Sequence, residues 1–386
     1  MNYASFLLRK VIKSKLFIVS VSIIIVIIVA CLALNLRNKD DQTLASNSKD
    51  QITFDTRQIK RSAFDKTKAN RDNIKLTQKD RQMNRRIQKM TKIKKWRSAY
   101  RSQIAYNNWQ LQSENNSRVV DRSLVNLWMS EIYRCHYLYK LNLPEQSRSS
   151  PTTGISFAMF VDQMISSVLI PLLIIFNFGL LYTRRFGHNV DKDRLLPMSI
   201  KQSEWHNLSV GYTVAGLFVL IAVVTSLLAA SLISGFGNWR YPIAFYTPKL
   251  PFNIYVSQGS LVLPTLILRI LSACFIVTCV YCIATLTKQV LSTVLISTLM
   301  LIGTSLVTPD LKLLAKVGQY LPTSYFNGVN VTSGQLAYET RNIQFSYIHG
   351  VVTLFIWIVV LMVISYVIQR IRQRYYDNGI AGISEN

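Results

Sequence analysis

Acidic residues are scarce in this chain of 386 residues, which has 19 Asp and Glu against 44 Lys and Arg and a net charge of +25. Charged residues of either sign make up only 16% of the chain, against a usual share of about 25%. Half of the residues are hydrophobic. This combination argues against a soluble globular protein and predicts that apolar and basic residues occupy separate segments.

Catalytic and metal-binding motifs are also absent from the sequence. There is no H-E-x-x-H, G-x-S-x-G or G-x-x-x-x-G-K-[ST] motif, so nothing indicates a zinc protease, a serine hydrolase or a nucleotide-binding P-loop. The four histidines lack the spacing of a metal site. Of the five cysteines only Cys135 lies outside the apolar runs, which excludes a disulfide within the polar segments. We expect this chain to be no enzyme, with no metal site and no cofactor.

Six apolar runs are long enough to cross a bilayer, which takes about 20 residues. The runs are Leu16–Leu36, Ile155–Tyr182, Leu208–Ile233, Leu261–Leu286, Val290–Val307 and Val351–Ile368. The last four contain a single charged residue, Arg269. These runs predict an all-α polytopic membrane protein with six transmembrane helices.

The first fifteen residues combine four basic side chains with an apolar face, which predicts a short amphipathic helix in the membrane surface. The apolar residues of this face are Phe6, Leu7, Val11 and Ile12. The residues before and including Cys31 fit a lipoprotein cleavage box, but the apolar run continues to Leu36 and five runs follow. We therefore expect a retained signal-anchor helix, with the amphipathic helix and first span in residues 1–36.

The distribution of Lys and Arg favours a cytoplasmic N-terminus and a cytoplasmic C-terminus. In this orientation the short cytoplasmic segments hold 13 basic residues, and the outer segments close to the membrane hold 10. The margin is narrow, but it agrees with an even number of spans.

Residues 37–154 form a predicted extracytoplasmic domain between the first two spans. Between Arg57 and Arg101 there are 17 basic and 3 acidic residues, no Pro and no Gly. In Val120–Leu141 apolar residues recur every three or four positions, which is typical of an amphipathic helix that needs a partner. Two antiparallel helices would provide one, and a disordered basic tether over Arg57–Arg101 is the alternative. Outside the cell, this segment would attract anionic lipid head groups, wall polymers or an acidic cargo. No motif for nucleic acid occurs.

Two charged residues fall inside the predicted spans, Asp162 in the second and Arg269 in the fourth. Counted from the outer ends of their spans, both lie roughly 11 Å below the membrane edge. An isolated charge at this depth costs several kcal/mol. Our hypothesis is that the two residues pair, or that both line an outer vestibule, and the alternative is that each snorkels to the interface.

The loop of residues 183–207 between the second and third spans carries the pattern of a docking segment. A charged cluster, Asp191-Lys192-Asp193-Arg194, precedes an apolar patch, Leu195-Leu196-Pro197-Met198, and a polar helix start at Ser199–Trp205. A short surface helix with an apolar tip suits the binding of a soluble partner.

These features resemble the permease subunits of ABC exporters of the second type. The segment LLPMSIKQSEW is similar to the family's coupling segment, although the preceding FGHNVDKDR departs from the acidic residue and Gly-Thr usual there. Residues Gln319–Gln335 resemble the segment before the family's last span, and the chain's own last span ends in Arg370, Arg372 and Arg374. The long loop after the first span resembles a subset with extracellular insertions. The order of these features carries the resemblance.

The resemblance implies a permease that pairs with a second copy or a homologous permease and binds a cytoplasmic ABC ATPase subunit, which holds ATP and Mg. The residues implied in ATPase docking are Asp193, Arg194, Leu195, Leu196 and Pro197. Pro322 and Tyr325 would shape an outer re-entrant segment, and Gly303 and Pro171 would give local backbone flexibility. Membrane lipid is a further expected partner.

The expected function is export of a peptide, lipid-linked or drug-like substrate across a bacterial plasma membrane, with residues 155–386 as a five-span membrane domain. The alternative is a membrane-anchored sensor or scaffold, whose basic extracytoplasmic hairpin binds an anionic polymer or peptide.

Overall fold

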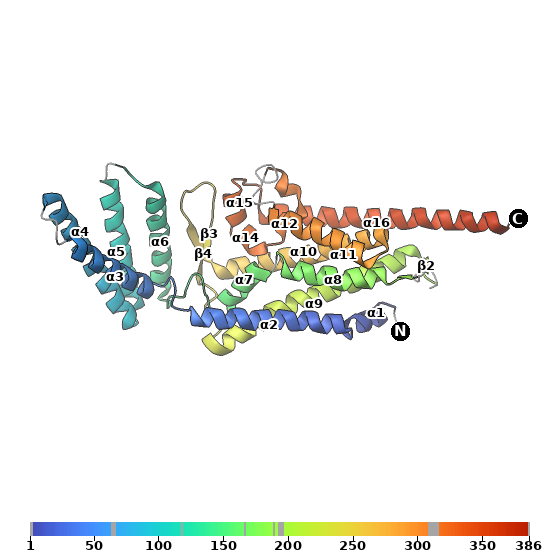
Figure 1. Ribbon diagram of the computed structural model, residues 1–386, viewed down its shortest axis with the longest axis horizontal. Helices are drawn as coiled ribbons and strands as arrows, with labels where there is room; N and C mark the ends of the chain where they lie inside the picture. Colours follow the sequence, from blue (N-terminus) through green and yellow to red (C-terminus); the bar gives the residue numbers. More distant parts are fainter. Residues whose placement is uncertain are drawn as a thin grey trace. The chain divides into compact units, whose positions relative to one another are not determined.

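Helices make up 79% of the chain, and there is almost no sheet. The computed structural model describes residues 3–62, 67–116, 119–165, 167–187, 190–191, 197–307 and 316–384 (Figure 1). The chain divides into two compact units. The first unit comprises Met1–Val29, Met159–Ser226 and Leu261–Asn386, and the second comprises Ala30–Ala158 and Leu227–Ser260.

Five helices are long and apolar enough to cross a membrane. They are α2 (Lys15–Arg37), α9 (Ile200–Ser234), α10 (Gln258–Thr287), the stretch Val290–Val307, and Tyr347–Arg374 within α16 (Tyr347–Ser384). Each overlaps a predicted apolar run, which confirms the helices expected there. α9 begins two turns earlier than its run, because the polar segment before Leu208 is also helical, and α16 continues well beyond the end of its run at Ile368.

The second apolar run forms two helices rather than one, which corrects the prediction of a continuous span. α7 (Gly154–Ile165) and α8 (Leu169–Thr183) are bent by 59° and make a sixth span only if they are taken together. Pro171 lies in the first turn of α8, where its missing N–H is tolerated. In a continuous helix its ring would clash with the carbonyl group four residues earlier, which explains a break at this place.

The span Val290–Val307 contains a short π-helix. α11 (Val290–Thr298) leads into the π-helix η2 (Leu299–Gly303), and α12 (Thr304–Val307) follows. A π turn holds more residues than an α turn, and such turns occur often at functional sites. Gly303 ends this turn, and a Cβ atom added to it would meet nothing within 4 Å. Packing alone therefore does not require glycine there.

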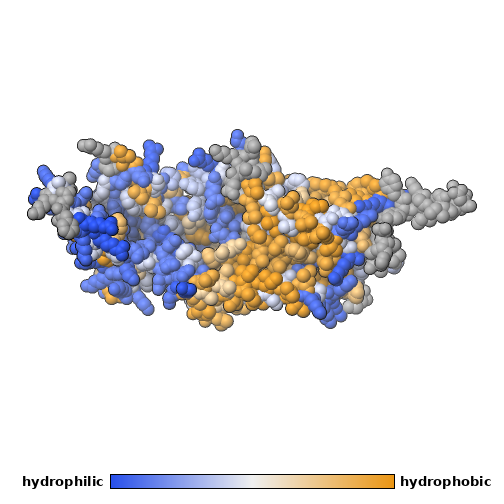
Figure 2. Space-filling model, viewed as in Figure 1, coloured by the Kyte–Doolittle hydropathy of each residue, from blue (hydrophilic) through white to orange (hydrophobic). Residues whose placement is uncertain are grey.

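The spans differ in how much of their most apolar stretch is buried. In α10 72% of the most apolar stretch is buried, against 28% in α9 and 11% in α16. Figure 2 shows hydrophobic side chains gathered on the surface over these helices. A contiguous apolar surface of this kind is compatible with a multi-pass membrane protein, because lipid tails cover it without cost.

Shorter elements complete the first unit. α1 (Tyr3–Ile12) is the predicted amphipathic helix, with Leu7 and Val11 buried and Phe6 and Ile12 exposed. Two short pairing strands follow α8, namely β1 (Phe186–Gly187) and β2 (Val190–Asp191). Four short helices precede α16: η3 (Gly318–Tyr320), η4 (Pro322–Tyr325), α14 (Gly328–Thr332) and α15 (Gln335–Glu339).

The second unit holds four helices of the insertion, where two were predicted. They are α3 (Leu44–Ser62), α4 (Lys68–Lys92), α5 (Trp96–Asn115) and α6 (Arg122–Leu141). The described part of the basic segment is helical, and its chain reverses where Lys94 takes a left-handed φ of 55°. α6 confirms the predicted amphipathic helix, with Asp121 as its N-cap and Asn142 as a left-handed C-cap.

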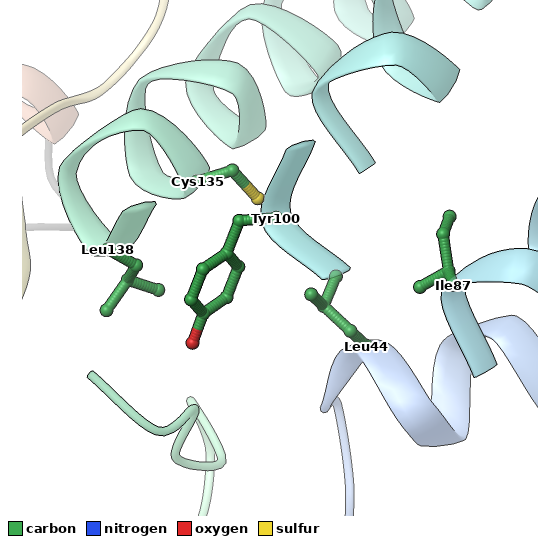
Figure 3. Close-up of a cluster of buried hydrophobic side chains, with 5 residues drawn as sticks. All are labelled: Leu44, Ile87, Tyr100, Cys135 and Leu138. Carbon is green, nitrogen blue, oxygen red and sulfur yellow. The ribbon is translucent and has the colours of Figure 1, made fainter. Parts of the chain in front are cut away.

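The four helices share one hydrophobic core, to which the antiparallel hairpin of β3 (Pro242–Phe245) and β4 (Ile254–Ser257) contributes the nearby Tyr241. The most buried side chains of this core are Leu44, Ile87, Tyr100, Cys135 and Leu138 (Figure 3). The Tyr100 hydroxyl donates a hydrogen bond to the carbonyl oxygen of Leu143 at 2.7 Å. Each buried Leu or Ile side chain of this core contributes roughly 1.5–3 kcal/mol of burial energy.

A buried charge network holds α6 to the chain that follows it. Arg134 Nη2 lies 2.7 Å from both Glu131 Oε1 and Glu145 Oε1, and Arg148 also pairs with Glu131. Burial alone would raise the pKa of Glu131, but the two arginines lower it to about 2. Glu131 is therefore ionised and paired throughout the physiological range.

The carboxylate of Asp55, on the side of α3 that faces α4, has a less favourable environment than that of Glu131. Asp55 is buried, and Gln51 Nε2 donates to its Oδ1 at 3.0 Å. Burial and the neighbouring carboxylate of Asp80 raise the pKa of Asp55 to about 6, although Gln51 and Arg81 oppose the shift. At neutral pH this ionised group destabilises the second unit.

Candidate functional site

The two charged residues within the predicted spans form an ion pair in the first unit. Arg269 Nε of α10 lies 3.1 Å from Asp162 Oδ1 of α7, and their side chains are 4% and 13% exposed. This contact is the pairing that the hypothesis described as its first possibility. Because both side chains are largely buried, neither reaches the membrane interface by snorkelling. Because each charge neutralises the other, neither carries the full cost of an isolated charge in a hydrocarbon layer.

The ion pair is tied to the segment before the last span. Arg269 Nη1 donates to the carbonyl oxygen of Phe326 at 3.2 Å. Gln163, next to Asp162, donates through Nε2 to Asn330 Oδ1 at 2.7 Å, and Asn327 Nδ2 donates to the carbonyl oxygen of Gln163 at 3.1 Å. We call Asp162, Gln163, Arg269, Asn327 and Asn330 the ion-pair cluster.

Pro322 and Tyr325, the residues predicted to shape the re-entrant segment, belong to the same neighbourhood. Pro322 begins η4, and the fully buried Tyr325 ends it. The Tyr325 hydroxyl donates to the carbonyl oxygen of Gln319 at 2.8 Å, and Ser272 of α10 donates to the carbonyl oxygen of Tyr325 at 3.3 Å. A Cβ atom at Gly350 of α16 would lie 2.6 Å from the Tyr325 ring, so the two segments are in close contact.

A second buried polar cluster surrounds Arg185, the second residue after the end of α8. Arg185 Nη1 donates to the Tyr281 hydroxyl of α10 at 3.1 Å. Its guanidinium group lies 4.4 Å from the ring centre of Phe186 and 5.2 Å from that of Tyr281. These two cation–π contacts compensate part of the cost of burying the charge.

Two further helices join this cluster. Gln369 Nε2 of α16 donates to the Tyr281 hydroxyl at 3.1 Å. Glu204, in the first turns of α9, is buried close enough to Arg185 for their charges to interact. Its Oε1 atom has no hydrogen-bond partner among the described residues. We call Arg185, Glu204, Tyr281 and Gln369 the Arg185 cluster, and it joins the segment after α8 to α9, α10 and α16.

The predicted docking residues are placed only in part. Asp193, Arg194, Leu195 and Leu196 lie outside the described residues, whereas Pro197 is exposed just before α9. Trp205 is 59% exposed next to the buried Glu204, so α9 begins with one side chain facing outward and the next facing inward. Two members of the Arg185 cluster, Arg185 and Glu204, therefore lie near the two ends of the predicted docking loop.

Sequence reasoning missed the Arg185 cluster. Arg185 and Glu204 lie in a sequence segment rich in charged residues. The local sequence pattern does not distinguish these two buried residues from exposed neighbours such as Lys201. The usable signal was that each lies within a few residues of an apolar run. Tyr281 and Gln369 gave no signal, because single polar residues near the ends of apolar runs are common.

Along α10 the two clusters are separated by the twelve residues from Arg269 to Tyr281, which is about 18 Å of helix. The most buried span therefore connects them.

No group of three His, Cys, Asp or Glu side chains in the described ranges is placed to hold a metal ion. The class of molecule that fold and sites define is a mostly helical chain with five apolar helices able to cross a membrane, or six with the bent pair. No family model, no curated protein and no solved structure matches the chain.

Proposed function

We propose that the chain is the membrane-spanning permease subunit of an ATP-driven ABC exporter. The order of elements supports this proposal: a short amphipathic helix, six spans with α7 and α8 taken as one, a polar loop after α8, and short helices before α16. Six spans place both termini on one side, and we assign this side to the cytoplasm of a bacterial cell. The insertion of α3–α6 then faces outward.

The Arg185 cluster is the observation that carries the proposal. The loop proposed to dock the ATPase leaves the membrane at Arg185 and returns at Glu204, and both residues are buried. Arg185 contacts Tyr281 of α10, which in turn contacts Gln369 of α16. A displacement of the loop therefore acts on two further spans through buried polar contacts, which an anchor without moving parts does not need.

In the proposed cycle, ATP binding closes two ATPase subunits and displaces the docking loop of each permease copy. Arg185 and Glu204 move with the loop, and α10 transmits this movement to Arg269 in the ion-pair cluster. Rocking between inward- and outward-facing states then exports a peptide, lipid-linked or drug-like substrate. ATP and Mg²⁺ stay on the ATPase subunit.

Co-purification in a mild detergent tests the docking step. An ATPase subunit is expected to accompany the tagged chain from its native membrane, and the triple variant Asp193→Ala, Leu195→Ala, Leu196→Ala is expected to release it. If no ATPase accompanies a wild-type chain that still dimerises, the proposal fails. If the ATPase stays bound to the triple variant, the docking assignment is wrong.

The variant Glu204→Gln tests the coupling step. We expect the ATPase to remain bound while transport-coupled ATP hydrolysis in proteoliposomes falls about ten-fold, which corresponds to a coupling energy near 1.4 kcal/mol. Lys201→Gln is the matched control, because Lys201 lies one turn earlier on α9 and is exposed. Equal effects of both variants would show that the Arg185 cluster does not transmit the movement.

A membrane-anchored sensor or scaffold is the second candidate function, and the exposed basic side chains of α4 favour it. They include Arg71, Lys75, Lys79, Arg85, Arg86, Lys89 and Lys92. Such a surface attracts an anionic polymer or peptide. Binding of a soluble polyanion to the purified chain, together with absence of any ATPase, would favour this function over export.

A further inference from the structure

A groove of about 800 Å³ lies within the first unit, between α1, the start of α2 and the end of α8. Its lining includes the apolar side chains of Phe6 in α1 and of Leu180 and Leu181 in α8, which we call the apolar wall. Phe6 remains 53% exposed although it belongs to an otherwise apolar helix face. A surface of this kind, beside an amphipathic helix, suits contact with an acyl chain.

Three exposed cations line the same groove, namely Lys10, Lys15 and Arg184. No described residue that lines the groove is acidic. None of the three cations takes part in an ion pair within the part of the chain that the structure describes. Cations gathered without a counter-charge raise the local potential and attract an anion.

We propose that this groove binds an anionic phospholipid, with its phosphate among Lys10, Lys15 and Arg184 and an acyl chain along the apolar wall. Basic pockets beside membrane-spanning helices recognise lipid head groups in this way. A soluble phosphate compound would satisfy the cations and leave the apolar wall uncovered, so the site is assigned to a lipid. The inference requires only that the chain lies in a membrane, and it is independent of the proposed export function.

Arg185 also lines the groove, so the bound lipid lies next to the Arg185 cluster. Arg185 itself is buried and bonded to Tyr281, and we assign the lipid phosphate to the three exposed cations instead. The lipid site and the cluster thus share one residue but use different charges.

Lipid titration of the full-length protein tests the inference. The protein is delipidated in detergent and titrated with phosphatidylglycerol or with phosphatidylcholine of the same acyl chains, and bound lipid is counted by native mass spectrometry. We expect phosphatidylglycerol to bind at least ten-fold more tightly. The double variant Lys10→Gln, Lys15→Gln is expected to weaken this binding by roughly 25-fold, because each cation near an anionic surface contributes about five-fold.

The double variant Arg9→Gln, Lys13→Gln is the matched control. It removes the same charge from the same segment, but neither residue lines the groove, so its affinity is expected to stay close to that of the wild type. Equal losses in the two double variants would mean general attraction to the basic N-terminus and would overturn the proposal. Equal affinity for the two lipids would overturn it as well.

A second variant separates a lipid from a soluble phosphate. Leu181→Gln changes the apolar wall and leaves all cations in place, so it is expected to weaken phosphatidylglycerol binding several-fold. Glycerol phosphate alone is expected not to displace the lipid at equal concentration. If glycerol phosphate competes fully and Leu181→Gln has no effect, the groove is a site for soluble phosphate and the lipid assignment is wrong.

Discussion

The ion pair between Asp162 and Arg269 allows a quantitative test of how the spans are held together. Removing one partner of a buried pair leaves the other charge uncompensated, which costs about 3–5 kcal/mol. We therefore expect Asp162→Asn and Arg269→Gln each to destabilise the protein by roughly this amount. Arg269 has a further hydrogen bond to Phe326, so its replacement is expected to cost about 1 kcal/mol more.

The double variant Asp162→Asn, Arg269→Gln decides whether the two charges act together. It leaves no buried charge, so we expect it to recover a coupling energy of about 2–3 kcal/mol relative to the sum of the single variants. Unfolding in mixed detergent micelles, followed by circular dichroism, measures all four proteins of the cycle. The exposed pair Lys75–Asp72 is the control, with an expected coupling of about 0.5 kcal/mol or less. Additive effects at Asp162 and Arg269 would refute the reasoning.

Three predictions concern the second unit. The pKa of Glu131 is lowered to about 2 from 4.5, so its network stabilises the unit above pH 4.5 and loses this contribution as the pH falls toward 2. Hydrogen-exchange protection of α6 should therefore fall over the same pH range. In the variant Glu131→Gln this pH dependence should be absent. The pKa of Asp55 is raised to about 6, so stability rises as the pH falls through this value. Asp55→Asn is therefore expected to stabilise the unit at pH 7 by about 2 kcal/mol. The control Asp50→Asn, on the exposed side of α3, is expected to have no such effect. An unchanged urea unfolding midpoint for Asp55→Asn would contradict the prediction. Leu138→Ala should cost about 2–5 kcal/mol by leaving a cavity, which faster tryptic cleavage in α4 would report.

The spanning helices could be predicted from the sequence because a bilayer requires long apolar runs, and this requirement is met locally. The break between α7 and α8 was less accessible, although Pro171 marks it within one turn. The pairing of Asp162 with Arg269 could be proposed because both residues lie at equal depth in their runs. Depth alone, however, gives no information on which spans are neighbours.

The four helices of the insertion were harder to predict. The reversal between α4 and α5 contains no Gly or Pro, and it uses a lysine, Lys94, in the left-handed region. Sequence patterns that depend on turn residues do not detect such a turn. The Arg185 cluster brings together residues from three helices and from the segment after α8, among them Tyr281 and Gln369, and contacts over such separations leave no periodic signal in the sequence.

The π-helix Leu299–Gly303 has a consequence for how the span Val290–Val307 can move. Conversion of this turn to α geometry would shift the register by one residue and rotate α12 by about 100° relative to α11. Such a rotation breaks the bond between Thr304 Oγ1 of α12 and Thr323 Oγ1 of η4, which is 3.1 Å long. Since Thr323 neighbours Pro322 in η4, a change of helical register in this span would remove one of the hydrogen bonds that hold η4, which α10 and α16 also contact.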